Sequence, residues 1–385
     1  MSIRKKSILV FTDWYLPGYR AGGPIRSLAN MVNTLKHDFY IVTRNTDHHS
    51  SEPYRNITPN EWIKTADNAR VYYFDEASIS ADVIEKIIRD LNCDRIYFNS
   101  LFSRKFTLLP LRIVRKMKLV DRAILAPRGM LKAGALSVKA GKKRVFLLFA
   151  KVTGLYDGLT WHATSHDEKN EIMGHFPKAL KIHIAPNLSS VPNDKPLKPH
   201  KQQGELKLVC IARISPEKGI LEAIRFLVAA ALNGNVTCDF YGTQQNASYL
   251  RECESVAGLS SHLRIQFKGD IPQHDIPVTI AKYHFFYLPT LGENHGHAIV
   301  EALTNATPVI ISDRTPWHGL ASKMAGWDLP LEAGPFTKVL TDALAMNNNE
   351  YQQWSDGAYK YGMQVALDYS TIEASHALFM APNEE

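Results

Sequence analysis

Short apolar segments alternate with longer amphipathic ones along the first half of the chain. The short segments are rich in β-branched and aromatic residues, which is typical of buried strands. They are Ser7–Thr12, Phe39–Thr43, Arg70–Phe74, Asp94–Asn99 and Ala123–Ala126. Between them, apolar residues three and four positions apart predict helices over Pro24–Lys36, Ala81–Leu91 and Phe106–Leu119. This alternation predicts a parallel sheet with helices on both faces.

The pattern stops at a polar stretch and then starts again. Ser189–Glu205 contains three prolines and is predicted to be a linker without regular structure. Strands are then predicted over Leu206–Ala212, Val236–Tyr241, Leu263–Phe267, His284–Leu288 and Pro308–Ser312, and helices over Glu217–Leu232, Ala247–Ala257, His297–Thr304 and most of Tyr351–Phe379. The predicted fold class is therefore α/β, with two Rossmann-like domains over residues 1–188 and 206–355. Ligands bind such sheets at the carboxyl ends of their strands, so a cleft between the domains is expected there.

Length and composition fit this two-domain organisation. The chain has 385 residues, of which 45% are hydrophobic. The longest apolar runs, such as Val145–Ala150, fit a core strand or a buried helix and are too short to span a bilayer. No signal-peptide pattern follows Met1–Lys6, so a cytosolic protein is expected. The cysteines are predicted to be reduced core residues rather than a disulfide or zinc site; they are Cys93, Cys210, Cys238 and Cys253.

Positive charge is concentrated in the first half of the chain. Residues 1–200 contain 32 Lys/Arg and 18 Asp/Glu, and Arg104–Lys151 alone contains 14 basic residues and one acid. This excess predicts a strong positive field. In the stretch Phe106–Val120, cations alternate with apolar residues, which fits two structures equally well. One is a helix that binds an anionic membrane surface, and the other is a helix that covers the sheet and has a solvated rim.

Three loops that follow predicted strands carry candidate binding groups. The loop Thr12–Pro24 ends in Gly22–Gly23 before a helix, where the backbone can approach an anionic ligand closely. In Arg213–Gly219, the guanidinium of Arg213 and the amine of Lys218 suit a pair of phosphates. A plain turn is the alternative for the first loop, and a surface turn with capping charges is the alternative for the second.

The third loop, Pro289–Glu301, combines more of the expected chemistry. Its carboxylates Glu293 and Glu301 are eight positions apart, one before the predicted helix and one inside it. The helix start offers backbone N–H groups for a phosphate, around His297, Ala298 and Ile299. Acids near a helix start also stabilise a helix, which would explain one glutamate but not the whole set.

These motifs together resemble the retaining glycosyltransferases of family four, which have the GT-B fold. The resemblance rests on Arg-x4-Lys from Arg213, on Glu-x7-Glu from Glu293, and on Thr307–Ile310. It extends to the Gly-Gly loop, to Ala163–Lys169 and to Ala185–Asn187, and so covers most of the chain. It implies a C-terminal helix, within 356–385, that packs back on the first domain.

The resemblance also implies a role for each matching residue. Arg213 and Lys218 would hold the donor diphosphate and stabilise the charge on the departing nucleotide, and Glu293 would contact the donor sugar, so these three residues are expected to be catalytic. Glu301 would bind the ribose. Gly22 and Gly23 would close on the phosphates, and the loop with Ile271 would lie near the base. The donor contacts would extend through the helix start, over Asn294, His295, Gly296, His297, Ala298 and Ile299.

Two positions depart from the family pattern. Arg128 stands where many relatives have a histidine that contacts the donor sugar, and His295 precedes Gly296 where relatives commonly have phenylalanine. Both changes leave the donor open. The sequence contains no Asp-x-Asp tripeptide, so no metal and no other cofactor is expected.

The expected activity is transfer of a sugar from a nucleotide-diphosphate sugar to a glycan or lipid-linked acceptor, in bacterial surface polysaccharide synthesis. The expected location is the cytoplasm, and the inner face of the plasma membrane is a candidate binding surface for 104–151. A sugar-nucleotide epimerase or a phosphorylase on the same fold are the enzyme alternatives. The alternative that is not an enzyme is a basic protein that binds polyanions. Against it, the basic residues lack the aromatic platform that nucleic-acid binding uses.

Overall fold

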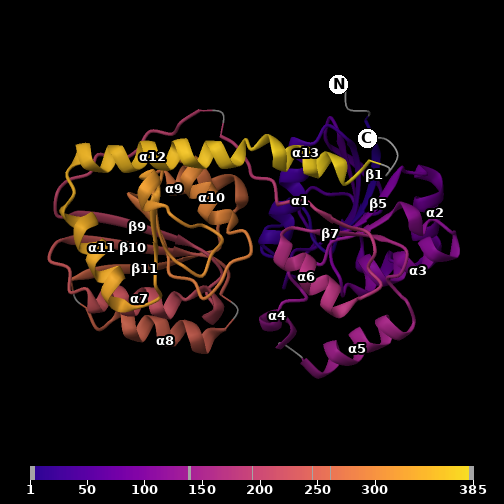
Figure 1. Cartoon of the computed structure of the whole chain (residues 1–385), viewed down its shortest axis with the longest axis horizontal. Helices are drawn as coiled ribbons and strands as arrows, with labels where there is room; N and C mark the ends of the chain where they lie inside the picture. The colour runs from indigo at the N-terminus through magenta and orange to yellow at the C-terminus, as the bar shows by residue number, and fades with distance from the viewer. Residues whose placement is uncertain (1–4, 138–139, 193, 245, 261, 381–385) are drawn as a thin grey trace. The chain divides into compact units, whose positions relative to one another are not determined.

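The computed structural model describes residues 5–137, 140–192, 194–244, 246–260 and 262–380. These residues form two compact units (Figure 1). The first contains the chain up to Leu188 and again from Tyr369, and the second contains Ser189–Asp368. Each unit is an α/β structure with a sheet and a hydrophobic core of its own.

The sheet of the first unit has eight strands in the order β3-β4-β2-β1-β5-β6-β7-β8. All its pairings are parallel except that between β3 and β4. The strands are β1 Ser7–Phe11, β2 Asp38–Arg44, β3 Trp62–Ala66, β4 Ala69–Phe74, β5 Arg95–Phe98, β6 Ala123–Leu125, β7 Thr160–Ala163 and β8 Ile182–Ile184. The helices are α1 Gly23–Thr34, α2 Ala81–Leu91, α3 Leu109–Lys116, α4 Ala133–Ser137, α5 Ala140–Val152, α6 His166–His175 and, from the end of the chain, α13 Tyr369–Ala377.

The sheet of the second unit has six parallel strands in the order β11-β10-β9-β12-β13-β14. Its strands are β9 Glu205–Ile211, β10 Asn235–Tyr241, β11 Leu263–Gly269, β12 Phe285–Leu288, β13 Val309–Ser312 and β14 Gly326–Leu329. Its helices are α7 Ile220–Ala229, α8 Ala247–Ala257, α9 Ile276–Ile280, α10 His297–Thr304, α11 Ala333–Ala345 and α12 Asn348–Ala366. The central strands β12 and β13 are apolar and buried along their whole length, as expected for a sheet covered on both faces.

Most predicted strands and helices are confirmed to within a few residues, but three predictions need correction. The helix predicted over Phe106–Leu119 begins with a π-helical turn at Arg104–Leu108 and continues as the short α3, whose apolar side chains are buried. The helical tail predicted over Tyr351–Phe379 is two helices, because α12 ends at Ala366 in the second unit and α13 begins at Tyr369 in the first.

The third correction concerns Val145–Ala150, which was predicted to be core. The segment lies in α5, and its side chains divide between the two faces of that helix. Leu147 and Ala150 are buried, whereas Val145, Leu148 and Phe149 are 70%, 64% and 51% exposed. The apolar run therefore forms both a packed face and an exposed one.

The predicted linker lacks helix and strand in its described residues up to Gly204, yet two lysines attach it to the second unit. Lys198 Nζ donates to Thr307 Oγ1 at 2.7 Å and to the carbonyl of Ile280 at 3.2 Å. Lys201 is almost fully buried, and its Nζ donates to three backbone carbonyls; these belong to Gln202, Leu344 and Met346. Burial lowers the pKa of Lys198 to about 7 and that of Lys201 to about 8.

The four cysteines are buried in the two cores, as predicted. Burial raises the pKa of the Cys93 thiol to about 12 and that of Cys253 to about 11. Thiols held in this way are poor nucleophiles. In the described part of the chain, every helix is too short or too polar to cross a membrane.

Candidate functional site

The second unit has a topological switch point between β9 and β12. Chain connections run from β9 outward through β10 to β11 on one side, and from β12 outward through β13 to β14 on the other. Open α/β sheets bind ligands beyond the carboxyl ends of the two strands at such a point. The loops that leave β9 and β12 there contain Lys218 and Glu293.

These two side chains form an ion pair. Lys218 Nζ lies 2.6 Å from Glu293 Oε1, and the two side chains are only 18% and 14% exposed. A charge-assisted hydrogen bond in this partly buried position fixes the lysine amine more firmly than a surface pair does. The structure thus brings together two of the three residues that the sequence predicted to be catalytic.

A close backbone approach holds the two loops against each other. Gly219 has φ +64°, and a Cβ built there would lie 2.0 Å from the carbonyl oxygen of Pro289. The carbonyl of Glu217 accepts from Thr290 Oγ1 at 3.2 Å and from the amide of Leu291 at 3.2 Å. Only glycine permits this contact, which places Lys218 beside the loop that carries Glu293.

Arg213, the third predicted catalytic residue, lies at the beginning of the same loop. Its guanidinium pairs with Glu217 at 3.0 Å, and both side chains are about half exposed. The pair is weak because water screens it, so the arginine can exchange this partner for another anion. The structure therefore shows Arg213 near Lys218 in sequence but paired within its own turn.

The start of α10 is preceded by a tight turn at Gly296. Gly296 has φ +74°, and a Cβ there would lie 2.8 Å from Ile299 Cδ1. The buried Trp317 donates from Nε1 to the carbonyl of His295 at 2.7 Å and so fixes the turn. The rings of His295 and His297 lie edge to face with centroids 4.6 Å apart, and Asn294 is exposed.

Not every amide at this helix start is available for a phosphate. The amide of Ile299 donates to the carbonyl of Gly296 at 2.8 Å, and the Ile299 side chain is fully buried. The Ile299 amide is thus already bonded within the first turn of α10, and its contact with a donor stays a prediction. Ala298, one position earlier, is also almost fully buried, so it can offer a ligand only its backbone.

Glu301 is 6% exposed on α10, and its Oε1 accepts from Gln273 Nε2 at 2.7 Å. Gln273 follows β11 by a few residues and was not predicted from the sequence. The half-buried Ile271, predicted to lie near a base, belongs to the same loop. One hydrogen bond thus joins two predicted parts of the donor site. It links the loop that was predicted to lie near the nucleotide base to Glu301, the carboxylate that was predicted to bind the ribose.

In the first unit, the loop after β1 ends at the predicted Gly22–Gly23 pair. Gly22 has φ +69° and precedes α1, and a Cβ there would meet nothing within 4 Å. Asp47 fixes the loop, because its Oδ2 accepts from the amides of Tyr19 at 3.0 Å and Arg20 at 3.3 Å. The predicted contact of Gly22 and Gly23 with a donor stays a prediction.

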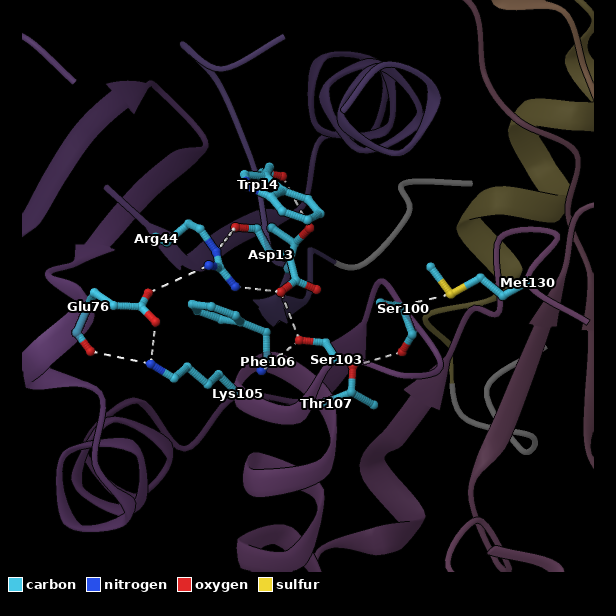
Figure 2. A network of polar contacts seen from close by, with 11 residues as sticks. Asp13, Trp14, Arg44, Glu76, Ser100, Ser103, Lys105, Phe106, Thr107 and Met130 are labelled. Carbon is cyan, nitrogen blue, oxygen red and sulfur yellow. Dashed lines mark hydrogen bonds and ion pairs between the residues drawn. The ribbon is translucent and has the colours of Figure 1, made fainter. Parts of the chain in front are cut away.

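A polar network that sequence reasoning missed fixes the start of that loop (Figure 2). Asp13 accepts from Arg44 NH2 at 2.8 Å and from Ser103 Oγ at 2.9 Å. The Arg44 guanidinium also lies 5.2 Å from the Trp14 ring and 5.4 Å from the Phe106 ring. These contacts hold the residues after β1 in place, and the sequence signal was an aspartate directly after the predicted strand Ser7–Thr12.

Arg128 makes three side-chain hydrogen bonds in the first unit. Its guanidinium donates at 2.7 Å to each of three uncharged oxygens; these belong to Asn99, Asn187 and Tyr97. The residue has φ +55°, a backbone conformation that is strained outside glycine. Arg128 is thus held in one orientation by a residue of β5, by the residue that follows β5, and by the loop after β8.

The same network fixes the protonation state of a buried histidine. Tyr97 donates from its hydroxyl to His162 Nδ1 at 2.7 Å, and His162 Nε2 donates to the carbonyl of Ala185 at 2.8 Å. Burial, together with the nearby Arg128 charge, lowers the pKa of His162 to about 3. The imidazole is therefore neutral, and it supports the arginine rather than acting as an acid or base.

Comparison with known proteins gives the context for both units. Residues 193–321 match the family model described as "Glycosyl transferases group 1". Anabaena Alr3699/HepE, in complex with UDP and glucose, has a TM-score of 0.67 at 16% identity, with 97% of this chain and 98% of that chain covered. WaaG, a glycosyltransferase involved in lipopolysaccharide biosynthesis, has a TM-score of 0.65 at 14% identity, with 97% and 100% covered. Trehalose-6-phosphate synthase OtsA has a TM-score of 0.69 at 10% identity, with 97% and 98% covered.

The fold is GT-B. At these identities the structural likeness establishes the fold alone, and the two Rossmann-like domains of GT-B correspond to the two units. No curated protein sequence matches the chain. The group 1 match covers the loops of Arg213, Lys218, Glu293 and Glu301, so the part of the GT-B fold that matches the family model is the part that carries the ion pair.

Proposed function

We propose that the protein is a retaining glycosyltransferase of family four that takes its sugar from a nucleotide-diphosphate sugar. The observation that carries the proposal is the Lys218–Glu293 pair, which lies at the switch point within the group 1 match. A fixed cation at the carboxyl ends of a parallel sheet suits a diphosphate.

Each charged residue has a separate part in the proposed reaction. Lys218 and Arg213 hold the diphosphate and stabilise the negative charge that grows on it as the glycosidic bond breaks. Glu293 keeps the lysine in place and contacts the donor sugar. Glu301, oriented by Gln273, accepts hydrogen bonds from the ribose hydroxyls.

We propose that the reaction needs neither a metal ion nor a protein nucleophile. The side chains at the switch point supply positive charge themselves, where other sugar transfers use a divalent ion. The acceptor attacks from the face that the nucleotide leaves, so the anomeric configuration is kept, and the protein contributes position and charge. Activity is therefore expected to be unchanged by EDTA.

We propose a glycan or lipid-linked acceptor and a role in bacterial surface polysaccharide synthesis. Two observations support this choice. The fold is shared with WaaG, which is involved in lipopolysaccharide biosynthesis, and the family resemblance includes enzymes that act on lipid-linked acceptors. The rigid Arg128, in place of the family histidine, favours a sugar that differs from that of most relatives.

The first test is thermal stability in the presence of UDP-, GDP-, ADP- and dTDP-sugars. UDP-glucose leads the panel because Alr3699/HepE binds it. A donor at about one hundred times its dissociation constant stabilises the folded protein by about 2.7 kcal/mol. A shift with one nucleotide identifies the base, whereas no shift with any of them contradicts the proposal. Conversion of the sugar nucleotide without an acceptor indicates an epimerase instead.

The second test separates the predicted site from ordinary surface charge. Lys218→Ala is expected to weaken donor binding at least about tenfold and to lower turnover at least about a hundredfold. Lys207→Ala is the matched control, because Lys207 forms a similar ion pair with Glu205, at 2.8 Å, near the amino end of β9. Equal effects of the two variants, measured by calorimetric titration of the donor, refute the site.

A further inference from the structure

Helix α5 carries an exposed apolar stripe. Its members are spaced i, i+3, i+4 and i+7, so they lie on one face of the helix; they are Val145, Leu148, Phe149 and Val152, with exposures of 70%, 64%, 51% and 78%. Single exposed apolar residues are ordinary, but four on one helix face form a contiguous patch of the kind that marks an interaction surface.

The opposite face of α5 is packed, which fixes the direction of the stripe. Leu147 and Ala150 are buried in the core of the first unit, and the Phe146 ring lies 5.5 Å from that of Phe102. Lys143 Nζ donates to the carbonyl of Ala135 at 2.6 Å. The helix is therefore attached along one side and exposes the stripe on the other, at the periphery of the unit (Figure 1).

Positive charge flanks the stripe. At about 100° per residue, Lys142 falls on one side of it, and Arg144 and Lys151 fall on the other. No aspartate or glutamate occurs in the sequence between Asp121 and Asp157. In the part of the chain that the structure describes, no carboxylate pairs with Lys142, Arg144 or Lys151.

Several cations earlier in the basic segment have partners within the first unit. Lys105 pairs with Glu76 and Lys116 with Glu85. Arg115 donates to the carbonyls of Gly154, Leu155 and Asp157, and its apolar neighbours on α3 are buried. For the stretch Phe106–Val120, the structure thus favours the helix that covers the sheet. Exposed cations occur in both segments, but of the two it is α5 whose cations flank an exposed apolar stripe.

We propose that α5 docks on the surface of an anionic lipid bilayer, with its apolar stripe at the boundary between headgroups and acyl chains and its cations among the lipid phosphates. A helix with an apolar face and flanking Lys/Arg binds membranes in this way. The charges beside the stripe favour an anionic bilayer over a second copy of the protein as its partner. A second copy of the same stripe would bring like charges together around the contact, whereas an anionic bilayer neutralises them.

The test is co-sedimentation of the full chain with phosphatidylcholine vesicles, with and without phosphatidylglycerol. Binding to the anionic vesicles is expected at low salt and is expected to weaken as salt shortens the range of the charges. The double variant Leu148→Ser/Phe149→Ser is expected to lower the partition at least about tenfold. The triple variant K142Q/R144Q/K151Q is expected to lower it about a hundredfold, from about fivefold for each cation.

Matched substitutions elsewhere serve as controls. Leu180→Ser/Leu259→Ser removes apolar side chains that are 91% and 75% exposed. K282Q/K338Q/K360Q removes three exposed cations of the second unit. Both controls are expected to bind anionic vesicles like the parent chain.

Three results overturn the proposal. The first is equal binding of the parent chain to neutral and anionic vesicles, and the second is equal loss of binding in the α5 variants and the controls. The third is a dimer in sedimentation equilibrium that Leu148→Ser/Phe149→Ser dissociates, which would make the stripe a contact between copies. The readout is lipid binding, so it does not depend on the proposed sugar transfer, and failure of either proposal leaves the other standing.

Discussion

The charged groups of the candidate site depend on backbone approaches that only particular residues allow. Lys218 reaches Glu293 because the next residue, Gly219, lets the β9 loop lie against the carbonyl of Pro289. In the same way, Gly296 lets the turn before α10 fit under Trp317. These glycines position the site although they carry no chemistry themselves.

Gly219→Ala is therefore expected to damage the site more than the same change at Gly22. Both glycines have positive φ, +64° and +69°, so an alanine costs about 1–2 kcal/mol of backbone strain at either position. Only at Gly219 does the new methyl group meet backbone, which adds about 1–3 kcal/mol and separates the two loops. Denaturant unfolding and donor titration of the two variants measure the difference. Equal losses contradict the role assigned to the approach.

At this scale the sequence predicts the ends of strands better than the contacts beyond them. Arg213, Lys218 and Glu293 were predicted because they follow recognisable strands, and Glu301 because it lies in the helix that comes next. Gln273 was not found, since its role depends on a contact across 28 positions of the chain.

At the scale of elements, apolar runs identified the buried parallel strands, but they do not show which side of a helix packs. The edge strand β3 and the short β8 were missed because their polar and apolar residues give weak patterns. In α5 the apolar run contains a buried face and an exposed one, and sequence periodicity cannot distinguish them. The predicted linker has the opposite property, since its lysines are polar in sequence but pack on the second unit.

Lys198 and Lys201 are expected to make the second unit more stable as pH rises. Their pKa values in the folded chain, about 7 and about 8, lie below the ordinary lysine value. At a pH between the folded and the ordinary pKa, the unfolded chain therefore binds more protons than the folded chain. The free energy of unfolding should rise from about pH 7 toward about pH 10, by up to about 1.4 kcal/mol per pH unit for each lysine.

Lys198→Met/Lys201→Met is expected to flatten this dependence, whereas Lys338→Met/Lys360→Met, at exposed positions, should leave it unchanged. Guanidinium unfolding at several pH values measures the slope. A slope that survives in the first double variant would assign it to other groups.

At the scale of the whole molecule, the chain returns to its first unit after forming the second. The residues from Tyr369 complete the first unit, where His183 Nε2 donates to the carbonyl of Ala374 at 2.9 Å and Arg95 donates to the carbonyl of Met380 at 2.7 Å. The family resemblance predicted this return, but it placed the change at residue 356 rather than after Asp368. The first unit is therefore complete only when the last part of the chain has been made.

Phe379→Ala is expected to destabilise the first unit selectively. The Phe379 ring is fully buried, with centroids 5.7 Å from His37, 6.2 Å from Phe39 and 5.8 Å from Tyr97. Truncating a buried phenylalanine costs about 3–5 kcal/mol, so the unfolding transition of this unit should move to lower temperature. The transition that a bound nucleotide sugar stabilises should not move, because the ion pair of Lys218 and Glu293 belongs to the second unit.

Tyr369→Ala is the matched control, since it removes a 68% exposed aromatic ring from the start of α13, in the same C-terminal segment, and should change neither transition. Calorimetric scans with and without donor separate the two units. If Phe379→Ala lowers both transitions equally, the units unfold together, and the C-terminal segment supports the whole molecule rather than the first unit alone.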